Sequence, residues 1–499
     1  MTPARIKSEV IELKYFAGGK WKASRSQDRH EILNPAKGKA IAEVPYCTAE
    51  EVDEAVEAAA AAFPGWRDTT IPARVRILFR YRELLDRHEE QLTRMVTREH
   101  GKTLEEARGS VRRGIEVVEF ACGIPSLLMG EAVENVGRGV DTYSIRQPLG
   151  VCAGIPPFNF PAMVPMWMFP LAIACGNTFV LKPSEKVPMT AVRLAELFTD
   201  AGLPEGVLNL VHGAKQVVDR LLEHPKVKAV SFVGSCAVAK YVYATAAAHG
   251  KRVQALGGAK NHIVVMPDAD IPQAAEAIIG SAFGCAGERC LAGSVVVAVG
   301  AVAGPLMAEL KQRAARLVTG DGAARGIEMG PVITAAHRER VLKYIEIGEK
   351  EGAKLVLDGR RSLQREGFFL APTLFDEVRP GSTLHREEIF GPVLSCVRVP
   401  DLESALAVVN SSELGNASSI FSNDAATVHE YCSRVEAGMI GVNVGVAAPL
   451  AFMPFSGWKG SFYGDLHAHG KDAVRFYTEQ KVITSRFSWK GSARKDSRV

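Results

Sequence analysis

Between residues 178 and 256, segments with the pattern of a β-strand alternate with segments that have the pattern of an α-helix. Strand patterns occur at 178–182, 207–211, 227–234 and 252–258, and helical patterns at 189–202, 215–224 and 235–250. Alternation in such short cycles predicts a doubly wound parallel sheet, the usual architecture for binding dinucleotides. This feature restricts the fold most strongly, and it places the chain in the α/β class.

The usual glycine-rich phosphate loop does not follow any of these strands. The nearest match to GxGxxG, GDGAARG at 320–326, has one residue too many and follows a helix. The turn at Gly234 and Ser235 offers another solution, because a helix that begins there presents free N–H groups to a phosphate. A plain β–α turn with a serine cap explains the same residues, so both interpretations stay open.

The remaining segments suggest further units. Thr48 and Glu51 form a capping-box pattern before an amphipathic helix, and helical patterns continue to about Gly123. A second α/β unit extends from 257 to about 460. The stretches 132–149 and 479–486 have strand patterns outside both units. The basic, polar tail at 488–499 is expected to be disordered.

Length and composition limit the possible functions. A chain of 499 residues exceeds what one hydrophobic core usually serves, so at least two domains are expected. The net charge of +4 is too small to favour a nucleic-acid partner. His467 and His469, without a further ligand motif, are interpreted as solvated loop residues rather than metal ligands, and no metal is expected.

The cysteines and apolar runs suggest a compartment. The nine cysteines form no CxxC pair, which is consistent with free thiols in a reducing environment. The N-terminal segment lacks the apolar core of a secretion signal. The longest apolar run, 164–175, is too short to span a bilayer and carries two prolines. We therefore expect a cytoplasmic protein with no membrane partner, with the mitochondrial matrix left open.

The stretch GCAGERC at 284–290 contains a candidate nucleophile. Cys290 follows Arg289 directly, but a lone cysteine is more often a small buried hydrophobic residue. No histidine lies within twenty residues on either side to act as a base, which argues against a cysteine hydrolase. Cys285 is the nearest competing thiol, and no role is assigned to it.

Five motifs then occur in an order known from one family. They are PFNFPAMVPMWMFPLAIACGNTFVLKPSE at 157–185, FVGS at 232–235, LGGAKN at 256–261, GERC at 287–290 and EEIFGPV at 387–393. The chain therefore resembles the NAD-dependent aldehyde dehydrogenases over nearly its whole length. Within that superfamily, PFNF, AKNH, GERC and FYTEQKVITS are most similar to the CoA-acylating methylmalonate-semialdehyde dehydrogenases.

The resemblance implies an aldehyde dehydrogenase fold with three parts. Residues 1–131 and 150–256 would form a Rossmann-like NAD domain, and 257–460 an α/β catalytic domain. Residues 132–149 and 461–499 would supply a small oligomerisation arm and the C-terminal tail. A homotetramer built from dimers is expected, with the strands of the arm pairing across subunits.

The same resemblance assigns roles to individual residues. Cys290 would be the nucleophile and Asn159 the side chain of the oxyanion hole, while Arg113 and Arg289 would hold a substrate carboxylate. Asn159 also fits a plain turn residue, and Arg113 an exposed helix charge. The implied NAD-binding residues are Lys182 and Glu185 at the adenosine ribose, Lys186 and Ser235 near the adenine and phosphates, Pro156 and Phe158 along the cleft, Gly257 at the nicotinamide, and Glu388 with Phe390 at the nicotinamide ribose.

Departures from the hydrolytic members of the family point to the reaction. Asn261 stands where a base glutamate is expected, and Met168 where a lysine is frequent. Because asparagine cannot take a proton, water would attack a thioester slowly, whereas the thiol of coenzyme A needs no strong base. The stretch 445–449, GVAAP, replaces a proline-rich loop and leaves the preferred substrate open.

The predicted function is therefore NAD-dependent, CoA-acylating oxidation and decarboxylation. Methylmalonate semialdehyde would give propionyl-CoA, and malonate semialdehyde acetyl-CoA. Two alternatives remain at this point: a hydrolytic aldehyde dehydrogenase with a relocated base, acting on another semialdehyde, and a catalytically silent relative.

Overall fold

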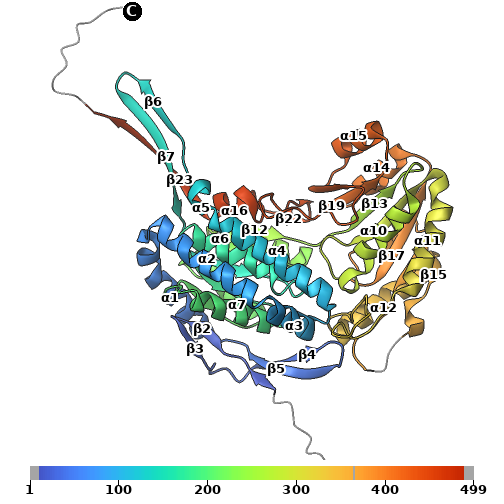
Figure 1. Cartoon of the computed structure of the whole chain (residues 1–499), viewed down its shortest axis with the longest axis horizontal. Coiled ribbons are helices and arrows are strands. Elements are labelled where there is room, and N and C mark those ends of the chain that lie inside the picture. Colours follow the sequence, from blue (N-terminus) through green and yellow to red (C-terminus); the bar gives the residue numbers. More distant parts are fainter. Residues whose placement is uncertain (1–9, 363–365, 488–499) are drawn as a thin grey trace, which may run out of the picture.

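A computed structural model describes residues 10–362 and 366–487, and two large sheets dominate it (Figure 1). The strand order of the first is β22-β12-β11-β8-β9-β10-β2-β3. Its strands are β22 (Phe462–Tyr463), β12 (Arg252–Leu256), β11 (Val227–Val233), β8 (Val151–Ile155), β9 (Thr178–Leu181), β10 (Leu208–Leu210), β2 (Tyr15–Ala17) and β3 (Lys20–Lys22). The five central strands from β12 to β10 are parallel, and the outer ones pair antiparallel. The predicted doubly wound sheet is confirmed, and β8 is a central strand that the sequence patterns did not identify.

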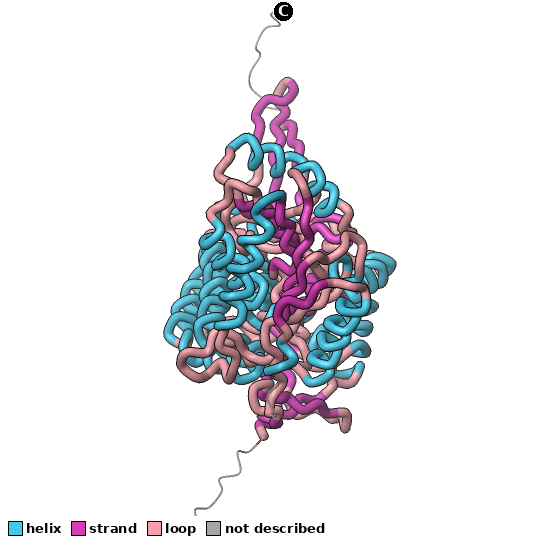
Figure 2. The backbone as a smooth tube through the Cα atoms, turned by 90° about the vertical axis from the view of Figure 1, so that its right-hand side faces the viewer, coloured by secondary structure: helices cyan, strands magenta, loops and turns pink. Residues whose placement is uncertain are grey.

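Helices pack against both faces of this sheet, and in Figure 2 helices also flank the strands of the half that faces the viewer. The predicted helices are confirmed as α7 (Pro188–Asp200), α8 (Lys215–Glu223) and α9 (Cys236–Ala248). The others here are α1 (Ala49–Asp68), α2 (Ile71–Arg87), α3 (Glu89–His100), α4 (Leu104–Cys122), α5 (Ile124–Leu127) and α6 (Met163–Ala174). Thr48 and Glu51 cap α1 reciprocally, as predicted. Helix α6 is almost wholly buried and packs against α4, so the long apolar motif forms the centre of the core.

The second sheet has the order β15-β16-β17-β14-β13-β19-β20 and is parallel except for β15. Its strands are β15 (Lys354–Leu357), β16 (Thr373–Asp376), β17 (Val393–Val399), β14 (Gly293–Val299), β13 (Asn261–Val265), β19 (Ala417–Phe421) and β20 (Met439–Val442). The helices here are α10 (Ile271–Phe283), η1 (Gly284–Gly287), η2 (Gly300–Val302), α11 (Ala303–Arg316), α12 (Ala335–Lys350), η3 (Gly359–Ser362), α13 (Thr383–Arg386), α14 (Leu402–Asn410) and α15 (Ala425–Arg434).

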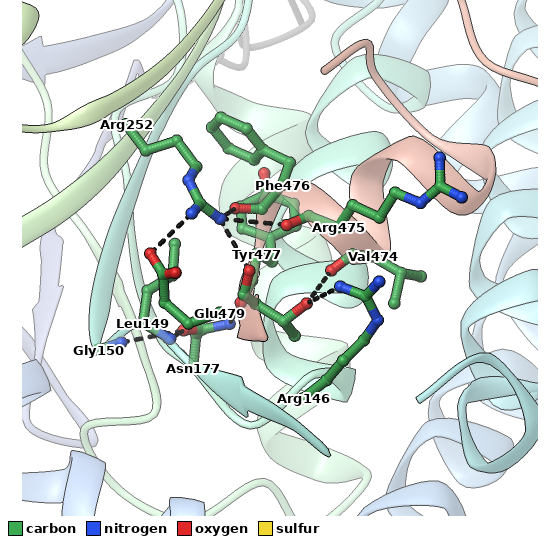
Figure 3. A network of polar contacts seen from close by, with 11 residues as sticks. Arg146, Leu149, Gly150, Asn177, Arg252, Val474, Arg475, Phe476, Tyr477 and Glu479 are labelled. Carbon is green, nitrogen blue, oxygen red and sulfur yellow. Dashed lines mark hydrogen bonds and ion pairs between the residues drawn. The ribbon is translucent and has the colours of Figure 1, made fainter. Parts of the chain in front are cut away.

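Three strands form an arm that projects from the body (Figure 1). They are β6 (Ala132–Gly137), β7 (Val140–Pro148) and β23 (Thr478–Arg486), which confirms the strand patterns at 132–149 and 479–486. Figure 3 shows the polar network at the base of the arm. Arg252 donates there to the carbonyls of Arg475, Phe476 and Thr478, and Asn177 donates to that of Tyr477. These bonds tie the end of α16 (Gly470–Phe476) to the first sheet.

Smaller pieces complete the chain. A three-stranded sheet joins β1 (Ile11–Glu12), β5 (Lys39–Pro45) and β4 (Arg29–Asn34), and β18 (Leu414–Gly415) pairs with β21 (Trp458–Lys459). In the described part of the chain, no helix combines the length and apolar character needed to cross a bilayer. The predicted disordered tail at 488–499 lies outside the described residues.

Candidate active site

Cys290 lies just before β14, where two cavities meet. The large cavity has a volume of about 660 Å³ and the small cavity about 270 Å³, and Cys290 lines both. Reacting groups can therefore approach Cys290 from two separate sides.

The large cavity lies outside the carboxyl ends of the parallel strands. Pro156 and Phe158 follow β8, Lys182 follows β9, Ser235 follows β11 and Gly257 follows β12. This is the edge at which open α/β sheets bind their ligands. The structure brings together all nine predicted cofactor residues here: Pro156, Phe158, Lys182, Glu185, Lys186, Ser235, Gly257, Glu388 and Phe390.

The chemistry of the large cavity fits a dinucleotide. Ser235 is the N-cap of α9 and makes no capping bond with its side chain, so the positive end of a helix borders the cavity. Lys182 is buried with its Nζ 3.4 Å from Glu185, and burial lowers the pKa of this lysine. Lys186 lies over the ring of Phe158 at 4.7 Å. Cations and a helix N-terminus along one groove suit phosphate and ribose groups.

Two glycines allow other parts of the chain to approach the backbone closely at the edge of this cavity. A Cβ added to Gly258 would lie 2.2 Å from Glu388 Oε2, and one on Gly257 2.9 Å from a backbone oxygen. Glu388 accepts a hydrogen bond from the backbone N–H of Ala259 at 2.8 Å, and burial raises the pKa of its carboxyl group. Phe390 adopts a left-handed conformation with φ of +58° and meets Phe158 edge-on. These contacts join the two large units at the cavity.

Asn159 borders the large cavity beside Cys290. Its side chain Nδ2 donates to the carbonyl of Glu288 at 2.9 Å, and Lys102 donates to its backbone carbonyl at 2.6 Å. An amide nitrogen has two hydrogens, so one N–H remains for an oxygen on the substrate. The arrangement can stabilise negative charge on an adduct of Cys290.

The thiol of Cys290 is neutral at pH 7 in this structure. Burial raises its pKa to about 12, and the nearby charge of Glu388 acts in the same direction. Arg289 and the backbone N–H groups of Cys290 and Leu291 lower the pKa, but they do not outweigh burial. Formation of the thiolate therefore depends on further positive charge, such as that of an oxidised nicotinamide ring.

The small cavity is mostly apolar and includes both predicted substrate arginines. Arg113 on α4 donates to Glu116 Oε2 at 2.9 Å and to the carbonyl of Pro449 at 3.2 Å. Arg289 donates through Nη2 to Glu106 at 3.2 Å. Each arginine thus has one glutamate partner in the free protein, and neither guanidinium has all of its five N–H groups engaged in protein hydrogen bonds.

A strained turn leads into Cys290. Cys285 and Ala286 have φ of +52° and +53°, and Gly287 follows with +74°. Left-handed backbone costs a non-glycine residue roughly 1–2 kcal/mol. Glu106 holds the turn, because its Oε1 accepts from the backbone N–H of Cys285 at 2.6 Å and from Arg289.

Several residues of the site were not identified from the sequence. Glu106 belongs to a capping box with Thr103, a pattern that is visible at 103–106, but nothing in the sequence shows its contact with the turn. Glu288 is fully buried, and burial raises its pKa to about 8. His337 Nε2 lies 3.5 Å from Glu288 Oε1 and 2.7 Å from the carbonyl of Phe390. No local signal indicates these pairings, which join distant segments.

Two predictions are corrected. Asn261 was expected at the place of a base glutamate, but its side chain is turned to the backbone: its Nδ2 donates to the carbonyls of Cys290 and Ala292, and its Oδ1 accepts from the N–H of Ala417. A carboxylate there would face two carbonyl oxygens instead of water at the sulfur. His469 is not a solvated loop residue, because it is 3% exposed and lines the small cavity. Among the described residues, no cluster of three or more His, Cys, Asp or Glu side chains could hold a metal ion.

Comparisons with known proteins agree with this geometry. The sequence matches the aldehyde dehydrogenase family over residues 21–483. It is 57% identical to malonate-semialdehyde dehydrogenase 3 of Geobacillus kaustophilus (strain HTA426), over 96% of this chain and 100% of that one. It is 54% identical to a malonate-semialdehyde dehydrogenase of Halalkalibacterium halodurans, over 95% and 98% of the two chains.

Solved structures show the same fold. The methylmalonate-semialdehyde dehydrogenase DddC from Oceanimonas doudoroffii superposes with a TM-score of 0.95 at 46% identity, covering 97% of this chain and 99% of that one. A protein from Sinorhizobium meliloti 1021, described as a methylmalonate-semialdehyde dehydrogenase and solved in complex with NAD, also gives 0.95, at 47% identity over 98% and 100% of the chains.

Proposed function

This chain belongs to the aldehyde dehydrogenase family, and from this premise we propose that it oxidises malonate or methylmalonate semialdehyde with NAD and transfers the acyl group to coenzyme A. The carboxylate of the substrate leaves as CO₂, so the products are acetyl-CoA or propionyl-CoA. The observation that carries the proposal is the pair Arg113 and Arg289 in the small cavity beside Cys290.

The reaction begins at Cys290. Its thiolate adds to the aldehyde carbon, and the resulting oxyanion accepts hydrogen bonds from the free N–H of Asn159. NAD, held by the residues of the large cavity, supplies the hydride acceptor. Loss of hydride from the adduct leaves a thioester on Cys290, which the thiol of coenzyme A cleaves by transthioesterification.

The arginines select the substrate. A guanidinium binds a carboxylate through two parallel hydrogen bonds, and the small cavity brings two guanidinium groups to one apolar space. In a three-carbon semialdehyde the carboxylate becomes β to the thioester carbonyl. The C–C bond then breaks with its electrons passing into the thioester as an enolate, CO₂ departs, and a proton is added to the carbon.

Three of the four acids that line the two cavities are paired with cations, which favours coenzyme A over water as the acceptor. The acidic residues that line the two cavities in the described chain are Glu106, Glu116, Glu185 and Glu388. The first three are held by Arg289, Arg113 and Lys182 respectively. Burial raises the pKa of Glu388, and the charge of Glu388 raises the pKa of Cys290. Glu388 is therefore the candidate base if the enzyme is hydrolytic.

Product analysis separates these possibilities. NADH, acyl-CoA, CO₂ and free acid are measured with several semialdehydes, with and without coenzyme A. Acyl-CoA with stoichiometric CO₂ is expected. Free acid produced at the same rate without coenzyme A would favour the hydrolytic alternative, and no NADH with any semialdehyde would indicate a silent relative.

The arm supports assembly into a homotetramer of dimers. Val133, Tyr143 and Val482 are exposed apolar residues of the arm, and β23 and β20 are edge strands with one side unpaired in the described chain. In this proposal residues 1–131 and 150–256 form the NAD domain, 257–460 the catalytic domain, and the arm joins subunits. A monomeric mass in solution at micromolar concentration would contradict the assembly.

A further inference from the structure

Helix α4 presents a stripe of residues to the small cavity, and one position in this stripe has no side chain. Glu106, Gly109, Arg113 and Glu116 line the cavity at spacings of three and four residues, so they share one face of the helix. Glu106 holds Arg289 through an ion pair, and Arg113 follows Gly109 by one turn. Gly109 therefore lies between the two residues that bring the arginines to the cavity.

The described protein contains no neighbour that requires a glycine at 109, although glycine is unfavourable inside a helix. Gly114, also on α4, allows close packing, because a Cβ there would lie 2.1 Å from Cε of Met166 on α6. Gly284 makes room for Arg289, whose guanidinium carbon would lie 2.4 Å from an added Cβ. A Cβ on Gly109 meets no atom of the described chain within 4 Å. The space beside this helical position is therefore open to a ligand in the cavity.

The small cavity is also larger than a three-carbon semialdehyde needs. Its volume is about 270 Å³, whereas a cavity of roughly 10–15 Å³ already holds one water molecule. A substrate that reaches from Cys290 to the arginines leaves unfilled space beside its central carbon. Burial of an alkyl group in such space is favourable, because much of the remaining wall is apolar. This wall includes Val117, Met163, Trp167, Leu291, Val446 and Phe455.

Resting on the proposed function, we propose that the small cavity accepts semialdehydes with an alkyl group larger than methyl on the carbon between the aldehyde and the carboxylate, and that Gly109 provides the room. The alkyl group lies beside α4 while the carboxylate stays on the arginines. The reaction is otherwise the same, so 2-ethylmalonate semialdehyde, NAD and coenzyme A give butanoyl-CoA, CO₂ and NADH. Gly109 is then a specificity-determining residue, because a side chain there would occupy the space of the alkyl group.

The test compares substrates of increasing width in four proteins. We would measure kcat/KM, with NAD and coenzyme A, for malonate, methylmalonate, 2-ethylmalonate and 2-propylmalonate semialdehyde. The proteins are the wild type, Gly109→Ala, Gly109→Leu and the control Gly65→Leu. Gly65 also lies inside a helix, α1, and an added Cβ there meets no atom of the described chain within 4 Å, but Gly65 does not line the small cavity. The control therefore reports any general effect of replacing a helical glycine.

In the wild type, kcat/KM for 2-ethylmalonate semialdehyde should lie within about tenfold of that for methylmalonate semialdehyde. Gly109→Leu should lower the ratio of kcat/KM for the 2-ethyl compound to that for malonate semialdehyde by about 10–200-fold, mainly through KM, because the pocket for the alkyl group is filled. Gly109→Ala should lower this ratio less, since it adds a single methyl group. Gly65→Leu should keep the wild-type ratio.

A larger drop between the methyl and 2-ethyl compounds in the wild type overturns the inference. An unchanged ratio in Gly109→Leu overturns it as well. A Gly109→Leu protein that no longer folds and binds NAD also counts against it, because the protein itself would then need the space beside the helix. If the wild type formed no acyl-CoA from malonate semialdehyde, the proposed function would be refuted instead.

Discussion

The two cavities at Cys290 are built in different ways. The large cavity is formed mainly by the ends of consecutive strands and the turns that follow them, so its residues lie in short motifs. The small cavity combines α4, α6, the turn before Cys290 and loops near the end of the chain. A groove made by one repeating βα pattern can be found from local sequence, whereas a pocket made by four distant segments cannot.

Under the proposed function, this difference separates cofactor binding from substrate choice. The large cavity depends on backbone geometry, with glycines and a helix N-terminus as its main devices. The small cavity depends on individual side chains from helices and loops. Variants on the two sides should therefore have separable kinetic effects, and only changes at Cys290 itself should affect both.

The largest effect is expected for Cys290→Ala. Without the thiol no covalent adduct forms, so oxidation should fall by roughly 10⁴-fold or more. NAD binding, measured by calorimetry, should remain because the other residues of the large cavity are unchanged. Cys285→Ala serves as the matched control. Substantial turnover in Cys290→Ala, together with loss of activity in Cys285→Ala, would move the nucleophile to Cys285.

Much of the fold could be predicted because local pattern and tertiary structure agree there. The strands β9 to β12 and the helices between them follow the sequence patterns closely, and Thr48 caps α1 as expected. Strand β8 was missed because VCAGI carries a glycine and lies between two segments with other assignments. The placement of β22 in the first sheet also follows from a long-range contact that no local pattern encodes.

The site was predictable where a motif fixes the backbone. The nine predicted cofactor residues line one cavity because seven of them follow strands of the first sheet, and Glu388 and Phe390 lie against that edge from the second unit. Asn261 was misinterpreted because its place in a motif does not reveal that its amide turns toward the carbonyl of Cys290. His469 was misinterpreted because its burial depends on packing against Trp167 and Phe455. Nothing in the local sequence around His469 indicates these contacts.

Asn159→Ala should have the second largest effect. Loss of one oxyanion donor typically lowers kcat by about 10²–10³-fold. The side chain also supports the carbonyl of Glu288, so thermal stability should be measured in parallel. If the variant changed only KM for NAD, Asn159 would belong to the cofactor site alone. The proposed division of roles between the two cavities would then be wrong.

Arg113→Ala should affect only the small cavity. Removal of a charged hydrogen-bonding partner should raise KM for malonate semialdehyde by about 10–100-fold and leave KM for NAD near its wild-type value. Glu388→Ala is the mirror variant on the large cavity and should raise KM for NAD instead. If both variants changed both constants equally, the two cavities would not act as separate sites.

The smallest effect concerns Glu288, whose backbone carbonyl holds Asn159 and whose carboxyl group is buried between the two units. Its pKa is about 8 in the folded chain against 4.5 for an exposed carboxyl group, so the folded state binds the proton more tightly. The stabilisation is complete below pH 4.5 and is lost as pH rises through 8, which follows from proton linkage.

Glu288→Gln keeps an acceptor for the N–H of Ile333 but does not titrate. The melting temperature of the wild type should therefore fall more than that of the variant between pH 5.5 and 8.5, by a few degrees. If the melting temperatures of wild type and variant changed in parallel with pH, Glu288 would bind its proton equally well in the folded and unfolded states. The region between the cavities would then be more open to water than its burial indicates.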